Sequence, residues 1–176
     1  MSKNICSQMM REIEEIKSVE LFRAYHDAVH MEARHVMIDD NGLIRRLFKF
    51  PLVPDELIIS SRFTIPMQEI LDTVYSCIMA NLKEVDNWDI SRSDLAFTFP
   101  VGKVIGHGFI QRTDTTHPFD MSAIRVILSE PVKRGRLFCI KTAYPAPDMD
   151  EVDLVWDAKE AYEEKLFSRP QIRKGA

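Results

Sequence analysis

The spacing of apolar side chains changes along the chain, from a helical period in the first half to alternation in the second. Residues 9–37 carry apolar side chains among charged ones and contain neither Gly nor Pro, which predicts a helix. A second helix is expected over residues 67–84, where apolar positions follow helical spacing after a proline. Trp88 is then expected to anchor the core, and residues 157–166 to form a last helix.

Strands dominate the prediction for the second half of the chain. Asn41-Gly42 is a turn signal, and the prolines of residues 43–66 predict loops with a short strand over residues 57–63. Later apolar runs are bounded by Gly and Pro, and they predict four strands, over residues 95–99, 103–110, 123–128 and 137–144. Helices followed by strands predict an α+β fold, in which N-terminal helices pack on a mainly antiparallel sheet.

Composition narrows the class of protein. A chain of 176 residues fits one domain, and 45% hydrophobic with 28% charged residues suits a folded protein with a real core. No run approaches the ~20 apolar residues of a membrane helix, so no membrane anchor is expected. Acidic residues near the N-terminus interrupt any signal peptide.

The cysteines indicate the redox compartment. Cys6, Cys77 and Cys139 are odd in number and widely spaced, which favours a reducing compartment such as the cytoplasm. Cys77 and Cys139 are expected to be buried.

Charge is unevenly distributed along the chain. The formal net charge of −4 is unusual for a nucleic-acid binder. However, residues 103–141 are predominantly basic, whereas residues 148–164 are strongly acidic. This asymmetry fits an RNA-binding face beside a solvated helix, and it fits equally two ordinary solvated faces.

The histidines suggest two different chemistries. His26 and His30 have the i, i+4 spacing of zinc-binding HExxH helices, but no third ligand follows at the expected distance, so a zinc hydrolase is the weaker alternative. His35 lies beside Arg34, and Arg46 follows eleven residues later. Neighbouring cations would lower the pKa of His35, and a bound phosphate would raise it again. A histidine can titrate near neutral pH, which suits acid-base work. A histidine exposed at a helix end is the alternative interpretation.

The last predicted strand carries a polar pair at its end. Alternation predicts that Phe138, Ile140, Thr142 and Tyr144 share one face, with Thr142 and Tyr144 at the rim of the core. A hydroxyl and a phenol there could hold a phosphate, although both also occur as ordinary strand residues. Histidine, arginine, hydroxyl and phenol together are what metal-free phosphodiester cleavage needs. Gly106-His107-Gly108, in another strand, favours a bulge or a close backbone approach over a phosphate loop.

Seven short segments also occur in the order found in a known family. They are His30 with Arg34-His35-Val36, Arg46-Leu47, Ser60-Ser61-Arg62-Phe63-Thr64, Asn81 through Trp88, Val104-Ile105-Gly106-His107-Gly108, Ile124-Arg125-Val126-Ile127-Leu128 and Thr142-Ala143-Tyr144-Pro145. Together they resemble the bacterial RNase A-like toxin domains found at the C-termini of contact-dependent inhibition proteins and other polymorphic toxins. The resemblance covers residues 28–147, and so divides the chain into a helical leader (1–27), a toxin domain (28–147) and an acidic C-terminal helix and tail (148–176).

The resemblance implies an RNase A-like α+β fold without disulfides, and metal-independent cleavage of RNA, often tRNA, with no cofactor. The family's active-site quartet falls on His35, Arg46, Thr142 and Tyr144, and the adjacent Arg45, Lys141 and His30 are expected to bind substrate. A cognate immunity protein is the expected partner. Action is expected in the cytosol of the producing or target cell, after delivery by a secretion system. The alternative from another class is a non-catalytic interaction or immunity-type protein of a toxin system.

Overall fold

The N-terminal region is a series of short helices. The computed structural model describes residues 3–51, 57–113 and 115–167. Its first elements are α1 (Lys3–Glu15), α2 (Val19–Tyr25), α3 (Ala28–Met31), the π-helical turn η1 (Glu32–Val36) and α4 (Asp40–Leu47). The prediction of one helix over residues 9–37 is therefore wrong, because polar side chains cap new helices within and just after it. Ser18 accepts a hydrogen bond from Leu21 N–H at 3.3 Å, and Asp27 accepts one from His30 N–H at 3.3 Å.

Capping also explains why the turn signal at Asn41-Gly42 failed. Asp39 precedes α4, and its side chain accepts a hydrogen bond from the Gly42 N–H at 2.8 Å, so both signal residues lie inside the helix. The other helices are α5 (Met67–Ala80), α6 (Leu82–Asn87) and α7 (Met149–Phe167). The helix predicted over residues 67–84 is confirmed but is divided at Asn81, and the last helix begins earlier than expected. Trp88 is partly buried and packs against the core, as predicted.

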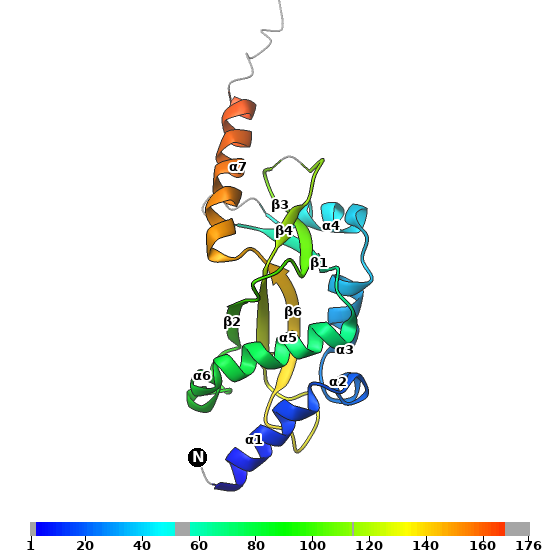
Figure 1. Ribbon diagram of the computed structural model, residues 1–176, viewed down its shortest axis with the longest axis vertical. Coiled ribbons are helices and arrows are strands. Elements are labelled where there is room, and N and C mark those ends of the chain that lie inside the picture. The colour runs from blue at the N-terminus through cyan, green and yellow to red at the C-terminus, as the bar shows by residue number, and fades with distance from the viewer. Residues whose placement is uncertain (1–2, 52–56, 114, 168–176) are drawn as a thin grey trace, which may run out of the picture.

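In the described part of the chain, six strands form two antiparallel sheets of three strands each. The first has the order β1 (Ile59–Phe63), β3 (Gly106–Ile110), β4 (Phe119–Met121), and the second β2 (Leu95–Pro100), β5 (Ala123–Ser129), β6 (Cys139–Ala146). The expected mainly antiparallel α+β fold is confirmed (Figure 1). The three-residue strand β4 was not predicted. Gly106 and Gly108 confirm the close backbone approach, because a Cβ on either would collide with a carbonyl oxygen of β1.

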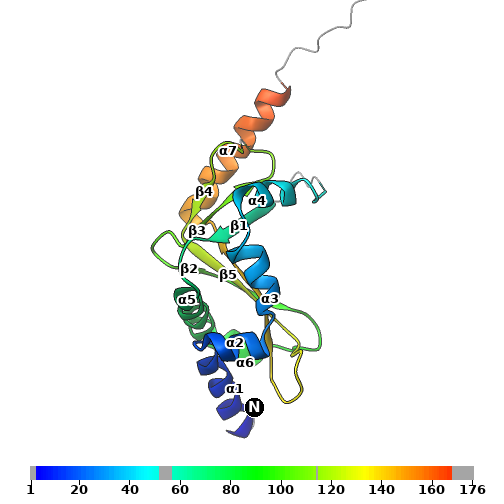
Figure 2. The same cartoon turned by 90° about the vertical axis from the view of Figure 1, so that its right-hand side faces the viewer.

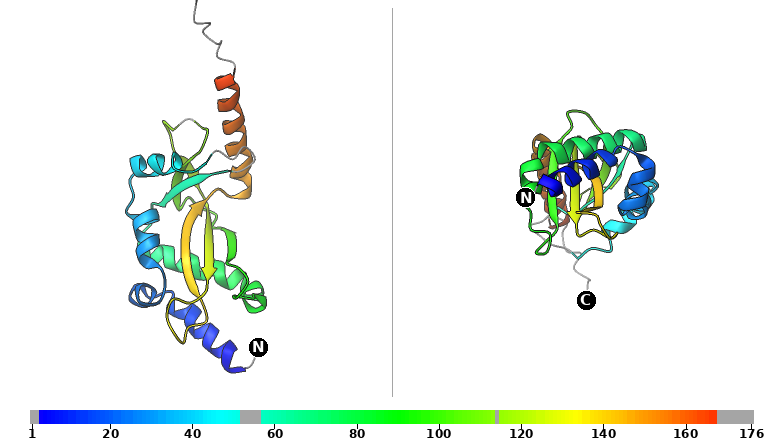
Figure 3. Two further views of the ribbon diagram at one scale, coloured as in Figure 1. Left: turned by 180° about the vertical axis from the view of Figure 1, so that it is seen from behind. Right: turned by 90° about the horizontal axis from the view of Figure 1, so that it is seen from below.

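The main core lies between α5 and one face of the β2-β5-β6 sheet. Ile124, Val126 and Leu128 of β5 are fully buried there, and they join buried side chains of α1 and α2 in one cluster. Figure 2 shows α3 and α5 on opposite sides of this sheet. Seen from behind, β5 and β6 face the viewer and α5 lies beyond them (Figure 3). We call the face of the β2-β5-β6 sheet that points away from α5 the open face.

A β-bulge in β6 decides which side chains reach the open face. Lys141 is the extra residue, because Leu128 pairs with Ile140 whereas the residue before Leu128 pairs with Thr142. One extra residue reverses the alternation, so Ile140 packs in the core while Thr142 and Tyr144 point to the open face. The prediction that Ile140 shares a face with Thr142 and Tyr144 is therefore wrong. The pairing of Thr142 with Tyr144 on one face is confirmed.

None of the helices in the described part of the chain is both long and apolar enough to cross a membrane. Of the cysteines, Cys77 and Cys139 are buried and Cys6 is exposed, and all three are free thiols. Burial raises the pKa of the Cys77 thiol to about 12, so this side chain behaves as a small apolar residue. The expectation of a fold without disulfides is confirmed.

Candidate active site

His35 lies in the π-helical turn η1, and a hydrogen bond to β1 orients its ring. In this turn the Met37 N–H donates to the Glu32 carbonyl at 2.8 Å, five residues back. Such turns widen the helix and are frequent at functional sites. His35 is only 7% exposed, and its Nδ1 lies 2.9 Å from the Ser61 carbonyl of β1. Because a carbonyl oxygen can only accept, Nδ1 carries the proton, and the neutral ring keeps its lone pair on Nε2.

Tyr144 lies against the histidine ring. The two ring centroids are 5.2 Å apart and the planes are inclined by 24°, which is a stacked arrangement. The Ser61 hydroxyl donates to the Pro145 carbonyl at 2.7 Å, so the residue that orients His35 is also tied to β6 beside Tyr144. Burial raises the pKa of Tyr144, while the charge and hydrogen bonding of Arg125 act in the opposite direction. The phenol is therefore protonated at neutral pH.

Two polar groups near this pair lack partners within the described residues. Arg46, in the last turn of α4, donates from Nη2 to the Arg34 carbonyl at 2.7 Å, but its Nε is buried without a hydrogen bond. The Thr142 hydroxyl, next to Tyr144 on the open face, is likewise buried and unpaired in the described part of the chain. Burying such groups costs free energy. Each of the two groups is a donor that a hydrogen-bond acceptor would satisfy.

The electrostatic environment keeps His35 neutral. Burial lowers its pKa to about 4, and the charges of Arg46, His30 and Arg34 add to this effect, although the hydrogen bond to Ser61 opposes it. The expected influence of neighbouring cations is present, but burial is the larger cause. His30 responds in the same way. Its pKa is lowered by burial first and also by the nearby arginines and Lys141.

The residues expected to bind substrate occupy different positions around this centre. Arg45 lines a groove of about 470 Å³ along α4, together with Arg34, Arg46 and Lys49. His30 is partly buried in α3. Lys141, the bulge residue, is exposed and forms an ion pair with Asp94 at 2.6 Å. His35 and Tyr144 are thus in contact. Arg46 and His30 are close enough to His35 to lower its pKa. Lys141 is paired with Asp94.

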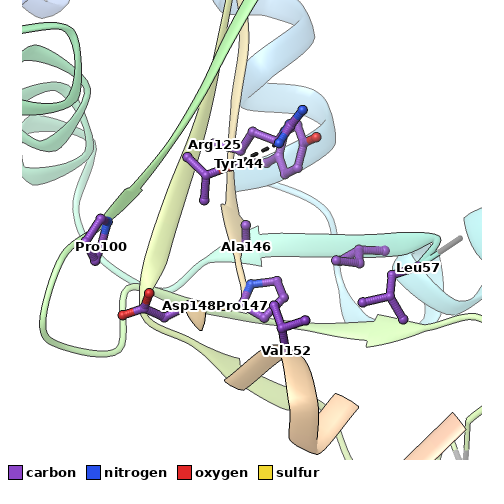
Figure 4. Close-up of a pocket in the computed structure, with 10 residues that line it drawn as sticks. Leu57, Pro100, Arg125, Tyr144, Ala146, Pro147, Asp148 and Val152 are labelled. Carbon is purple, nitrogen blue, oxygen red and sulfur yellow. Dashed lines mark hydrogen bonds between the residues drawn. The ribbon is translucent and has the colours of Figure 1, made fainter. Parts of the chain in front are cut away.

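A pocket that sequence reasoning missed adjoins Tyr144. It has a volume of about 800 Å³, and Arg125 and Tyr144 lie at one end of it with Asp148 and Val152 at the other (Figure 4). Arg125 pairs directly with Tyr144 across β5 and β6. The sequence shows that each residue is in a strand, but only the register between the strands reveals that they are neighbours. The sequence also gave no sign that Ser61 orients His35. Its backbone carbonyl makes the contact, and the type of side chain does not reveal this.

His26 has a structural position and does not form a metal site. It ends α2, and its Nδ1 accepts a hydrogen bond from the Ile140 N–H at 3.1 Å. His30 belongs to the separate helix α3, so the expectation of two histidines on one helix face is wrong. Within the described residues, no cluster of three His, Cys, Asp or Glu side chains could hold a metal ion. Burial is the main cause that lowers the pKa of His26 to about 4.

Comparison with known families decides the affiliation of the chain. The family model described as "Bacterial CdiA-CT RNAse A domain" matches residues 29–145, well over half of the chain. The chain belongs to this family. A CdiA-CT RNase A domain is an endoribonuclease, so the resemblance and the enzyme class expected from the sequence are confirmed. Among curated proteins, none matches the chain.

A solved structure supports the fold of this CdiA-CT RNase A domain. The crystal structure of a CdiA-CT/CdiI complex from Y. kristensenii 33638 is similar, with a TM-score of 0.53 and 21% sequence identity. The match covers 67% of this chain and 99% of the solved chain. The RNase A-like α+β fold is therefore shared. Helices α1, α2 and α7 lie outside the range matched by the family model.

Proposed function

We propose that this ribonuclease toxin domain cleaves RNA, with tRNA as its substrate class, through metal-independent attack of a ribose 2′-hydroxyl on the adjacent phosphorus. The hydrogen bond between His35 Nδ1 and the Ser61 carbonyl carries the proposal. It leaves Nε2 with a lone pair beside Tyr144, which is the state a general base requires. The catalytic unit comprises residues 28–147, between a leader (1–27) and an acidic segment (148–176).

His35 acts first. Its Nε2 takes the proton of the 2′-hydroxyl as the 2′-oxygen forms a bond to phosphorus, and the bond from phosphorus to the 5′-oxygen then breaks. The products are a 2′,3′-cyclic phosphate and a 5′-hydroxyl, which receives a proton as it leaves. A pKa of about 4 keeps the ring neutral before substrate binds. A bound phosphate would raise this pKa and so favour proton uptake.

Arg46 and Thr142 stabilise the charge that develops on the phosphate. The Nε of Arg46 and the hydroxyl of Thr142 are buried donors without partners in the described residues, so they are free to bind the non-bridging oxygens. The pentacoordinate phosphorane carries more negative charge on these oxygens than the ground state does. Donors fixed in advance by α4 and β6 therefore favour the transition state over the bound substrate.

Tyr144 serves at the leaving-group side of the reaction. Its raised pKa keeps the phenol protonated at neutral pH, so it can donate a hydrogen bond to the phosphate and supply a proton to the departing 5′-oxygen. Stacking on His35 fixes the ring, because rotation would break the contact between the two aromatic planes. Arg125, across the strand pair, stabilises the phenolate that forms if the proton is transferred.

The groove on α4 accounts for binding of the RNA backbone. Arg34, Arg45, Arg46 and Lys49 line it, which concentrates positive charge in a chain whose net charge is −4. Phosphate contacts of this kind supply affinity without reading sequence. On the side of α3 and β6, His30 offers a neutral imidazole and Lys141 an ammonium group that is paired with Asp94 in the free protein.

The solved relative crystallised as a CdiA-CT/CdiI complex. By analogy, this toxin domain binds a cognate immunity protein that protects the producing cell, and it acts in the cytosol of the target cell after delivery. The analogy rests on the family and the shared fold. Co-purification of this chain with the product of an adjacent gene would provide the partner for a direct binding measurement.

Cleavage of total tRNA in excess EDTA tests the proposal. Wild type, His35→Ala and His117→Ala are compared, because His117 is an exposed histidine in the loop before β4. We expect wild type and His117→Ala to cleave equally, and His35→Ala to lose at least ~100-fold in rate, as general-base removal does. Equal cleavage by all three would move the active site elsewhere. Loss of all cleavage in EDTA would indicate a metal-dependent reaction, and no cleavage under any condition would favour an interaction protein.

A further inference from the structure

The pocket beside Tyr144 has the features of a nucleobase-binding site. It encloses about 800 Å³, which is within the range of small-molecule sites and leaves room for a base and its ribose. Leu57, Ile59, Pro147 and Val152 provide apolar walls. Arg125 and Tyr144 lie at the end nearest the proposed catalytic residues, and the Asp148 side chain lies at the other end (Figure 4). An apolar cleft with a few polar groups at its ends fits a flat ligand with polar edges.

Three polar side chains form a row across the open face at that end. Thr98 of β2 pairs with Arg125 of β5, and Arg125 pairs with Tyr144 of β6. Directly opposed residues of neighbouring strands point to the same face, so the three side chains stand side by side. Arg125 Nη1 donates to the Thr98 hydroxyl oxygen at 3.0 Å. The Thr98 hydroxyl thus accepts from Arg125 and retains its own proton to donate to a ligand.

We propose that this pocket binds the nucleobase adjoining the scissile phosphate and that Arg125 selects guanine there. This inference rests on the proposed ribonuclease function, because Tyr144 both lines the pocket and stacks on His35. A base in the pocket is therefore adjacent to the phosphate that His35 and Tyr144 would act on. Thr98 positions the guanidinium, and Arg125 reads the edge of the base.

The chemistry of the row explains the choice of guanine. Arg125 and Thr98 present donors toward the pocket, so the favoured base must present acceptors. Guanine offers two neighbouring acceptors, O6 and N7, which match the fork of an arginine. Adenine places an amino donor beside its N7, so the same fork meets a donor instead of a second acceptor. A bidentate pair of this kind discriminates by about 1–3 kcal/mol, equivalent to a preference of about 5- to 140-fold.

Mapping cleavage sites in a random-sequence RNA pool tests the inference. Cut ends are sequenced after brief digestion by wild type, Arg125→Lys, Arg134→Lys and His35→Ala. Arg134 is the matched control, because it is an exposed arginine in the loop between β5 and β6. Lysine keeps the positive charge near Tyr144 but lacks the fork. A fourth variant, Thr98→Val, removes the hydroxyl that holds the guanidinium and serves if Arg125→Lys does not fold.

We expect wild type and Arg134→Lys to cut with guanine on one side of the scissile phosphate at least 10-fold more often than with adenine. The ratio of cleavage next to guanine to cleavage next to adenine should fall below about 3 in Arg125→Lys and should also decrease in Thr98→Val. Similar use of all four bases by wild type would overturn the inference, as would an unchanged guanine preference in Arg125→Lys. In both cases RNA cleavage dependent on His35 would still stand. If the pool is not cleaved, or is cleaved equally by His35→Ala, the proposed function itself fails.

Discussion

At the scale of single residues, the position of His35 determines its protonation state. One ring nitrogen donates to the Ser61 carbonyl, one ring face lies on Tyr144, and the ring is almost entirely buried. Burial and neighbouring positive charge both disfavour the imidazolium, so His35 is neutral in the free protein at neutral pH. This arrangement differs from an exposed histidine, which would be partly protonated near pH 6.5.

The pH dependence of cleavage should reflect this. We expect kcat/KM to rise as pH increases through about 4, where His35 loses its proton, and to be level from about pH 5 upward until another group titrates. The pH profile of kcat/KM reports the free enzyme, so it is the quantity to measure. An ascending limb centred at pH 6–7 would contradict the buried position of the base.

Stability should depend on pH through His26. Its pKa is about 4 in the folded chain and about 6.5 when unfolded, so the unfolded state binds more protons between these values. The stabilising effect is therefore complete above pH 6.5 and is lost as pH falls toward 4, by an amount on the order of 3 kcal/mol. Asn can accept the hydrogen bond from Ile140 N–H without titrating. Urea unfolding at pH 7 and pH 4.5 should show a smaller loss in His26→Asn than in wild type, whereas His117→Asn should match wild type.

At the scale of elements, α1 is fastened to the loop before β6 through a buried carboxylate. Glu12 is fully buried, accepts the Leu137 N–H at 2.9 Å and lies 3.6 Å from Arg136 Nε. Arg136 also pairs with Glu15 at 2.6 Å and stacks over Tyr25. These contacts join a helix outside the family-model range to the loop that leads into β6, the strand that carries Thr142 and Tyr144.

Removal of this carboxylate should destabilise the fold. We expect Glu12→Ala to lower the free energy of unfolding by about 1–3 kcal/mol, because it leaves the Leu137 N–H without its acceptor and removes one of the two carboxylates that pair with Arg136. Chemical denaturation gives the value, and Glu160→Ala on the exposed side of α7 is the control. A loss no greater than that of the control would show that the buried pair contributes nothing to holding α1 in place.

Elements were predictable from the sequence wherever a single pattern decided them. Alternating apolar runs bounded by Gly and Pro located β2, β3, β5 and β6, and helical spacing located α5. In the sequence, the capping residues Ser18 and Asp27 are a weaker indication than the apolar spacing around them, so several short helices were predicted as one. The bulge at Lys141 could not be predicted, because it arises from pairing with β5 and not from the sequence of β6. Arg125 was missed as a site residue for the same reason.

At the scale of the whole molecule, charge and shape separate the proposed RNA-binding side from the rest. The groove on α4 collects positive side chains, while α7 carries many of the acidic residues and extends from the end of the molecule opposite α1 (Figure 1). α7 is attached through the buried Val155 and through an ion pair between Arg112 and Glu163 at 3.1 Å. The net charge of −4 is thus compatible with a local cationic surface for RNA.

The chemical structure of the cleaved ends tests the central claim most directly. A defined RNA is cut by wild type in EDTA, and the same RNA carrying a single 2′-deoxynucleotide at the cleavage site is treated in parallel. The account predicts 2′,3′-cyclic phosphate and 5′-hydroxyl ends from the first RNA and no cleavage at that site in the second. Products with 5′-phosphate ends, or cleavage at the 2′-deoxy position, would contradict attack by the 2′-hydroxyl and with it the role of His35.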